Sequence, residues 1–477
     1  MGQSRISKIE RARVALRRFT DREDGSILIF SMFLLVGIFI IGGLAVDFMR
    51  IETERAKMQS TVDRAVLAAA DLDQTLSPAN VVKDYLAKAG LTDTLVGEPT
   101  VSEGLNYRIV SAKVQDDVPM FFGGLSRIFS PNARVHTSMT VPASATAQER
   151  VARVEISMVL DISGSMSSNS RIQNLRTAAT DFVTTVLDEE SSDLVSVSLV
   201  PYSEHVALSA DLFNAMKVNK THSYASYCLE FADSDFATTT MHPNTNYNQV
   251  QHFQWVNNSY NDMSHTVCPT VSYAPIMPWS QSQSDLTTRI AQLQPYSQTA
   301  IYLGMKWGVG LLDPSMNPVM QTLISKNKVD AVFADRPTAY TATDTLKFVI
   351  LMTDGENTSS YRIQDWAYST DSYKENWARY NLIWYLNRYV SSRNRSQYYY
   401  QKADSDYGDD MLEDICDAAK NAGIIVWTIG FETSSHGAEV MEDCASSPSH
   451  YFDVEGIEIS DAFHAIATQI NNLKLTR

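Results

Sequence analysis

An uncharged apolar segment near the N-terminus restricts the fold of this chain more than any other feature. It runs from Gly25 to Val46 and reads GSILIFSMFLLVGIFIIGGLAV. As a helix it would be about 33 Å long, enough to cross a hydrocarbon core of about 30 Å. We therefore predict a transmembrane helix over residues 25–47.

The residues before this segment are strongly basic, and such residues stay on the cytoplasmic side of a membrane. They are Arg5, Lys8, Arg11, Arg13, Arg17, Arg18 and Arg22. We predict a cytoplasmic tail over residues 1–24, with the rest of the chain exported. A cleaved signal peptide, with a small-residue site at Gly43–Ala45, is the alternative. It is disfavoured because the apolar stretch exceeds a signal core and no helix breaker follows before Pro78.

Residues 48–150 have the pattern of a small α+β domain. The helix is expected to continue past the membrane to about residue 72, since this part lacks Gly and Pro. A second short helix ends at Gly90, and residues 97–145 alternate as strands do. The first helix should bury one face, formed by Met58, Val62, Ala65, Val66 and Ala69.

From residue 151 to 477, apolar strands alternate with helices. The expected strands are 154–161, 193–203, 346–354 and 424–431, and the expected helices are 171–188, 299–312, 411–423 and 458–473. This alternation is typical of the α/β class, with a doubly wound, mostly parallel sheet.

Two long insertions interrupt this pattern, at residues 205–284 and 358–407. Both are rich in aromatic residues, as in QYYYQ at 397–401, which argues against disorder. Their aromatic side chains could form a partner surface or could pack over the sheet.

All four cysteines lie on the exported side, where an even set is expected to pair. Three connectivities are open. We favour Cys228–Cys268 and Cys416–Cys444, because each of these pairs lies within one segment of the chain.

The polar sequence DISGSM at 161–166 directly follows a predicted strand. In open α/β sheets, binding sites form outside the carboxyl ends of strands. Asp161, Ser163 and Ser165 occupy that place, as does Asp354 after its own strand, and Thr299 opens a predicted helix. These five groups offer only oxygen, which suits Mg²⁺, with Mn²⁺ and Ca²⁺ as alternatives. Hydroxyl ligands leave charge on the cation for a carboxylate of a partner protein.

These residues resemble the metal-ion-dependent adhesion site (MIDAS) of von Willebrand factor type A domains. DISGSMS matches the DxSxS motif of that family, while Thr299 in SQTAIYLGMKWG and Asp354 in LMTDGEN match its separate Thr and Asp. The resemblance covers roughly residues 152–475 and implies a Rossmann-like fold that binds a partner through the cation.

The N-terminal region resembles a second family, the TadG-like proteins of the tight-adherence (Flp) pilus assembly system. The shared features are the Gly-Ser before the apolar run, the Val-Asp that ends it and the helix DRAVLAAA. TadG-like proteins commonly carry a C-terminal type A domain. The resemblance implies a pilus-assembly or adhesion protein of the bacterial inner membrane, with one N-terminal helix and with periplasmic or surface-exposed domains.

Other interpretations of the same residues are weaker. The serines of DISGSM could simply cap the helix at 171–188. A metal-dependent hydrolase would need a base, and only Glu356 is near the predicted site. HExxH, GxSxG and GKS/GKT motifs are absent, and the GVG at 308–310 lies within a predicted helix. The formal net charge of −16 argues against nucleic acid as a partner. We predict a protein that is not an enzyme.

Overall fold

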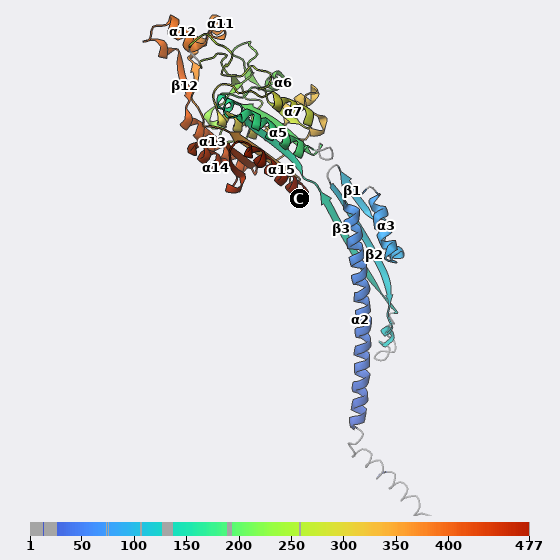
Figure 1. Cartoon of the computed structure of the whole chain (residues 1–477). Coiled ribbons are helices and arrows are strands. Elements are labelled where there is room, and N and C mark those ends of the chain that lie inside the picture. Colours follow the sequence, from blue (N-terminus) through green and yellow to red (C-terminus); the bar gives the residue numbers. More distant parts are fainter. Residues whose placement is uncertain are drawn as a thin grey trace, which may run out of the picture. The chain divides into compact units, whose positions relative to one another are not determined.

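The structure is a computed structural model of the whole chain (Figure 1). It describes Arg13 and residues 26–72, 74, 76–104, 107–125, 137–187, 193–256 and 259–476. Apart from Arg13, the basic residues of the predicted cytoplasmic tail lie outside this range. The chain divides into two compact units, residues 1–150 and 151–477.

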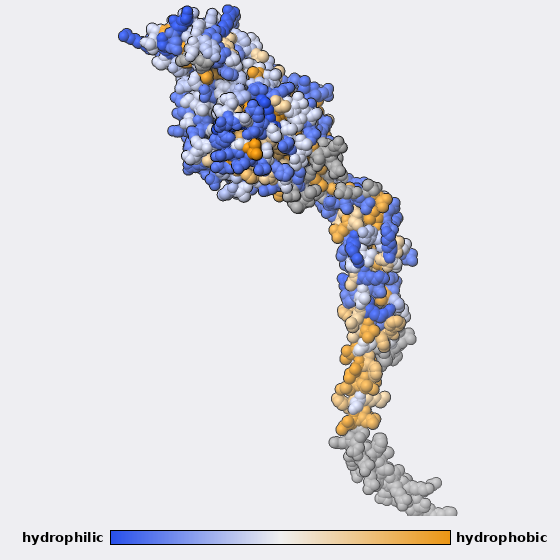
Figure 2. Space-filling view, in the orientation of Figure 1, coloured by the Kyte–Doolittle hydropathy of each residue, from blue (hydrophilic) through white to orange (hydrophobic). Residues whose placement is uncertain are grey.

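The first unit is built on one long helix, α2 (Ser26–Ala70). Its N-terminal part is apolar and exposed, with Ile27 and Phe33 each 74% accessible, and it forms the orange surface in Figure 2. This helix is long and apolar enough to span a membrane. Asp47 follows the uncharged segment, and its buried carboxylate accepts hydrogen bonds from the N–H groups of Phe121 and Phe122.

The C-terminal half of α2 packs on an antiparallel sheet in the order β1-β2-β3. The elements are β1 (Thr100–Gly104), β2 (Tyr107–Pro119), β3 (Ser138–Arg150) and the helix α3 (Pro78–Lys88). The five α2 residues predicted to share a buried face, from Met58 to Ala69, are all at most 1% exposed. Gly90 follows α3 with φ of +71°, the left-handed conformation that a glycine helix end favours.

The second unit contains a six-stranded sheet in the order β14-β13-β10-β4-β5-β9. The first five strands in this order run parallel, and β9 pairs antiparallel with β5 at the edge. The strands are β4 (Arg153–Asp161), β5 (Val195–Tyr202), β9 (Met277–Ser280), β10 (Thr345–Thr353), β13 (Ile425–Phe431) and β14 (Tyr451–Val454).

Helices cover both faces of this sheet, because side chains that alternate along a strand enter two different cores. On β4, Ile156 and Met158 join one core, whereas Val159 joins the other. The first core is closed by α5 (Arg171–Val186), α7 (Gln283–Gln292) and α15 (Glu458–Thr476). The second is closed by α8 (Ile301–Gly310), α9 (Asn317–Ser325), α13 (Ser405–Asn421) and α14 (Ser435–Cys444). The α/β class predicted from the sequence is confirmed in its coarser form, since the sheet is mixed and β9 runs antiparallel.

The first predicted insertion contains more regular structure than expected. It holds α6 (Ala210–Ala215) and a small sheet of β6 (Val218–Asn219), β7 (Leu229–Glu230) and β8 (Tyr247–Gln249). Its last part supplies β9, which belongs to the main sheet. The strand was missed because it has four residues, includes Pro278 and has a left-handed φ of 46° at Trp279.

The second predicted insertion forms a hairpin that carries three helices. These are β11 (Ser360–Ile363), α10 (Asp365–Tyr368), α11 (Asp371–Arg379), α12 (Leu382–Tyr389) and β12 (Tyr399–Ala403). Its aromatic residues divide between the two expected roles. Trp377 is 1% exposed and packs in the first core, whereas Trp366 and Tyr389 are 48% and 59% exposed.

Both predicted disulfides are present. Cys228 pairs with Cys268, and Cys416 pairs with Cys444. The first disulfide joins two loops of the segment between α6 and β9. The second links α13 to the last residue of α14.

Candidate functional site

The predicted oxygen ligands gather where β4 and β10 end. These strands pair in parallel, with Met352 opposite Leu160, so Asp161 and Asp354 follow the same edge of the sheet. Asp161 is fully buried and Asp354 is 4% exposed. The register of the sheet thus brings the two carboxylates together at the strand ends, as the sequence predicts.

A continuous chain of hydrogen bonds joins four of the five predicted residues. Asp161 Oδ1 accepts from Ser163 N at 2.7 Å, and the hydroxyls of Ser163 and Ser165 lie 2.9 Å apart. Ser165 Oγ then donates to Asp354 Oδ1 at 2.6 Å. Neither serine caps α5: Ser163 precedes the short 3-10 turn Gly164–Ser167, and the residue before α5 is Ser170. The alternative role of these serines as helix caps is therefore wrong.

Thr299 lies in the adjoining loop, two residues before the start of α8 rather than in its first turn. This loop contacts the DISGSM turn, because Ser297 O accepts a hydrogen bond from Gly164 N at 2.9 Å. It also contacts the loop after β10: Thr358 Oγ1 accepts from Thr299 N at 2.9 Å. Three loops thus meet at the predicted site, although among the described residues no hydrogen bond joins the Thr299 hydroxyl to the other four.

Burial determines the electrostatics of the two carboxylates. Burial, together with the nearby Asp354 carboxylate, raises the pKa of Asp161 to about 7. Burial also raises the pKa of Asp354, although hydrogen bonds from Ser165 and Arg171 oppose this rise. Asp161 receives hydrogen bonds only from neutral donors, Ser163 N and Thr353 Oγ1, in the described part of the chain. Asp161 has no cationic partner in the described part of the chain, and a divalent cation would stabilise such a buried carboxylate.

Three residues that sequence reasoning did not single out complete the site. Arg171 Nη1 donates to Asp354 Oδ2 at 2.8 Å, and its Nε donates to Glu432 Oε2, also at 2.8 Å. The buried Glu204 accepts from Ser297 Oγ at 3.0 Å and so fixes the loop that carries Thr299. The position of Arg171 at the start of the helix after DISGSM was the one available signal. Glu432 and Glu204 gave none, because their contacts depend on the tertiary fold.

The donor set fits a hard cation and does not fit zinc. The residues that would hold Mg²⁺ are Asp161, Ser163, Ser165, Thr299 and Asp354, which offer oxygen only. Within the described ranges, no group of three His, Cys, Asp or Glu side chains is placed to hold a metal. Any cation at this site therefore depends on hydroxyl ligands. Glu356, the one base considered for a hydrolase, accepts a hydrogen bond from Ser434 at the start of α14.

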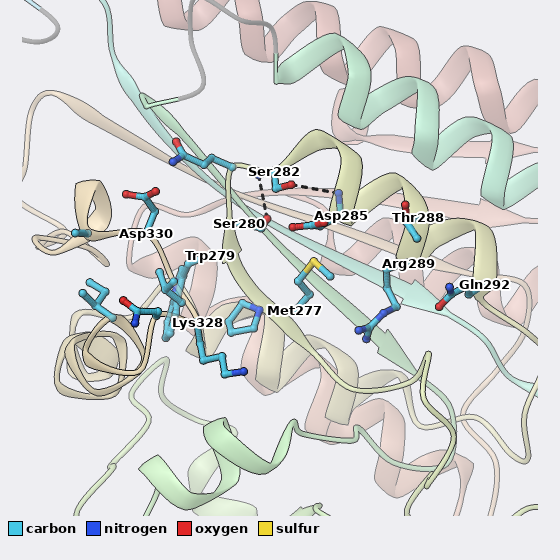
Figure 3. Close-up of a pocket in the computed structure, with 16 residues that line it drawn as sticks. Met277, Trp279, Ser280, Ser282, Asp285, Thr288, Arg289, Gln292, Lys328 and Asp330 are labelled. Carbon is cyan, nitrogen blue, oxygen red and sulfur yellow. Dashed lines mark hydrogen bonds between the residues drawn. The ribbon is translucent and has the colours of Figure 1, made fainter.

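The hollow drawn in Figure 3 lies elsewhere in the second unit. It has a volume of about 900 Å³ and lies between β9, α7 and the segment that follows α9. It shares no lining residue with the Asp161 cluster. Arg289 faces it and donates to Pro275 O at 3.0 Å. The predicted cation site is thus separate from this hollow.

Comparison with protein families identifies the N-terminal region. Residues 25–72 match the family described as putative Flp pilus-assembly TadE/G-like. The N-terminal segment is thus similar to that family. The match covers the exposed part of α2 and its continuation through the buried face of the first unit. No match was found among curated proteins.

Solved structures with some similarity include several pilus proteins. The vWF domain of the type V pili tip protein Mfa5 from Porphyromonas gingivalis is 15% identical, with a TM-score of 0.35, and the match covers 69% of this chain and 97% of that one. The pilus adhesin SpaC from Lactobacillus rhamnosus GG is 14% identical, with a TM-score of 0.33 and coverage of 79% and 34%. The PilB minor pilin from Streptococcus sanguinis is 13% identical, with a TM-score of 0.32 and coverage of 79% and 78%. These TM-scores are low, and the fold of this chain is defined by its own strand order.

Proposed function

We propose that this chain is a membrane-anchored pilus-assembly or adhesion protein whose second unit is a type A domain that binds a partner through a divalent cation. The observation that carries the proposal is the hydrogen-bonded chain from Asp161 through Ser163 and Ser165 to Asp354, at the carboxyl edge of a largely parallel sheet. The TadE/G-like segment supports the connection to pilus assembly and to the membrane.

The cation would supply a Lewis acid with a coordination position left for an anionic oxygen of the partner. The residues of this chain hold and orient it: the carboxylates provide charge, and the hydroxyls provide neutral ligands that leave charge unsatisfied. Mg²⁺ is the first choice for such a set, and Mn²⁺ or Ca²⁺ could replace it. A carboxylate on a pilus subunit or surface protein is the expected partner group.

Cation binding can be tested by thermal unfolding of the full chain in neutral detergent. Mg²⁺ should raise the unfolding temperature of the wild-type protein, and Asp161→Ala should abolish this rise, because a ligand that binds only the folded state stabilises it. Asp453→Ala is a matched control, since that carboxylate lies on the edge strand β14, outside the cluster. An equal effect of Mg²⁺ on both variants would contradict the proposal.

Partner binding is tested separately, by capture of membrane and pilus proteins with the full chain in Mg²⁺ or in chelator. Partners should be lost in chelator and with Ser163→Ala. Export is tested by protease treatment of spheroplasts, in which residues 50–477 should be cleaved. Protection of the second unit would overturn the proposed orientation.

A further inference from the structure

The second insertion carries an unusual concentration of positive charge. From Asn376 to Ala403 the sequence contains no Asp or Glu, although the whole chain has a formal net charge of −16. The cationic residues of this stretch are Arg379, Arg388, Arg393, Arg395 and Lys402. The same stretch is rich in tyrosine and tryptophan. Such a local reversal of charge indicates a surface that meets an anionic ligand.

The aromatic rings around α12 form a cluster. Tyr380 and Trp384 are stacked, with ring centroids 5.8 Å apart and planes 10° apart. The Trp384 and Tyr389 ring centroids are 6.0 Å apart, and Tyr389 is 59% exposed. The Arg388 guanidinium lies over both of these rings, 5.8 Å from the Trp384 centroid and 5.9 Å from that of Tyr389. We call Tyr380, Trp384, Arg388, Tyr389 and the exposed Arg393 the basic aromatic face.

The positive charges of this face lack acidic partners. In the described part of the chain, neither Arg388 nor Arg393 forms an ion pair with a carboxylate. Arg395 differs, because its guanidinium donates to Val390 O, Asn387 O and Asn387 Oδ1 and so holds the turn after α12. Arg388 and Arg393 are therefore available to an external anion, while Arg395 has a structural role.

The scaffold beneath the face is well packed. Leu382 and Leu386 of α12 are at most 1% exposed and belong to the first core. Asn381 accepts from Trp384 N at 3.1 Å, while its side-chain amide donates to Val256 O. The exposed Tyr389 and the half-buried Tyr380 and Trp384 are thus held by a helix that is packed on the core, and binding would order few side chains. A preorganised surface of this kind lowers the entropic cost of association.

We propose that the basic aromatic face binds an acidic polysaccharide. Sugar rings would lie against the accessible side of this ring cluster, where Tyr389 is exposed, and carboxylates along the polymer would pair with Arg388 and Arg393. Guanidinium groups match the planar geometry of carboxylates, and aromatic rings offer a flat apolar surface to the C–H face of a sugar. An open cluster of rings on the surface, rather than a single ring in a cavity, suits an extended polymer.

Two other anionic ligands fit this face less well. Insertion into a lipid surface needs a continuous apolar helix face, but the leucines of α12 are buried in the core, and the surface over α11 and α12 is mostly hydrophilic in Figure 2. Nucleic acid carries a dense phosphate charge that the acidic remainder of the chain would repel. A polysaccharide with widely spaced carboxylates is repelled less.

The test uses the full chain in neutral detergent and immobilised alginate, a polymer of uronic acids. The wild-type protein should bind alginate in a salt-dependent manner and bind neutral dextran at least about tenfold more weakly. Arg388→Gln/Arg393→Gln and Trp384→Ala should each weaken alginate binding about tenfold, and Trp384→Phe should retain most of it, since the ring is kept.

A matched control removes two cations elsewhere on the same unit. Lys326→Gln/Lys328→Gln changes the net charge equally, but these lysines pair with Asp211, so alginate binding should be unchanged. Failure of the wild type to bind alginate, or equal binding by all variants, would overturn the proposal. Tighter binding to single-stranded DNA or to phosphatidylglycerol vesicles through the same residues would overturn the ligand class. The measurement is made in chelator, so it is independent of the cation site.

Discussion

Arg171 and Asp354 form an ion pair of 2.8 Å at the site where we propose that a divalent cation binds. The Asp354 side chain is fully buried, and the Arg171 side chain is 16% exposed. The guanidinium also bonds to Glu432, 261 residues away in the sequence. Arg171 therefore supplies positive charge to Asp354, and a bound cation would have to share this carboxylate with it.

Arg171→Gln should strengthen Mg²⁺ binding about tenfold, because it removes a positive charge next to a proposed ligand. The same change should destabilise the metal-free protein by roughly 2–4 kcal/mol, since it leaves a buried carboxylate without its partner. Titration with Mg²⁺ and urea unfolding in chelator measure the two effects. Arg176→Gln, on the same helix, is the control, because Arg176 bonds to the Leu293 carbonyl and not to a carboxylate. Weaker Mg²⁺ binding by Arg171→Gln would show that the guanidinium supports the cation.

The proximity of Asp161 and Asp354 could be predicted from sequence, whereas the Arg171–Glu432 contact could not. Both aspartates end apolar runs, and parallel strands place such ends at one edge. The contact with Glu432 requires that β13 lie beside β10 in the sheet. Glu432 itself has a left-handed φ of 53°, which no local sequence pattern predicts. The edge strand β9 could not be predicted from the sequence either, because four residues are too few to show a strand periodicity. Cation binding by the five oxygen groups stays a prediction.

A second prediction concerns pH. His205 is buried, and neither of its ring nitrogens has a hydrogen-bond partner in the described part of the chain. Burial disfavours the charged imidazolium and lowers the pKa of His205 to about 3, from 6.5. Below pH 6.5 the imidazole is therefore protonated in the unfolded state, whereas in the folded state it stays neutral down to about pH 3. The free energy of unfolding thus falls as pH decreases through this range.

His205→Phe should remove this dependence. Between pH 6.5 and about pH 4.5, the wild-type protein should lose roughly 2 kcal/mol more unfolding free energy than the variant does. Urea unfolding at the two pH values gives this difference. His436→Gln is a control of opposite sign, because Asp409 raises the pKa of the exposed His436. Parallel pH profiles for the wild type and His205→Phe would rule out a buried neutral imidazole.

The third prediction concerns the disulfide between Cys228 and Cys268, which closes a 40-residue separation with both residues fully buried. Cys228→Ala/Cys268→Ala should lower the unfolding free energy by about 3–4 kcal/mol, because the unfolded chain gains the freedom of an open loop. Cys416→Ala/Cys444→Ala, with a separation of 28, should cost slightly less. Denaturant unfolding with and without reductant measures both. Labelling of all four thiols in the unreduced protein would contradict the pairing.

The last prediction concerns the GVG sequence at 308–310. These residues lie within α8 and not in a phosphate-binding loop. This helix packs so closely on β4 that a Cβ atom at Gly308 would lie 2.3 Å from Val159 Cγ2. Gly308→Ala should therefore destabilise the protein by roughly 1–3 kcal/mol, since the helix or the strand must shift. Gly355→Ala is the matched control, because no atom would lie within 4 Å of its new Cβ.

A double-mutant cycle with Val159→Ala isolates this contact. Val159→Ala alone should also destabilise the fold, because it removes buried methyl groups. In the double variant the two changes compensate, so the total loss should be smaller than the sum of the separate losses. Urea unfolding of the four proteins measures the coupling. Strictly additive losses would show that the glycine is needed for a reason other than its contact with Val159.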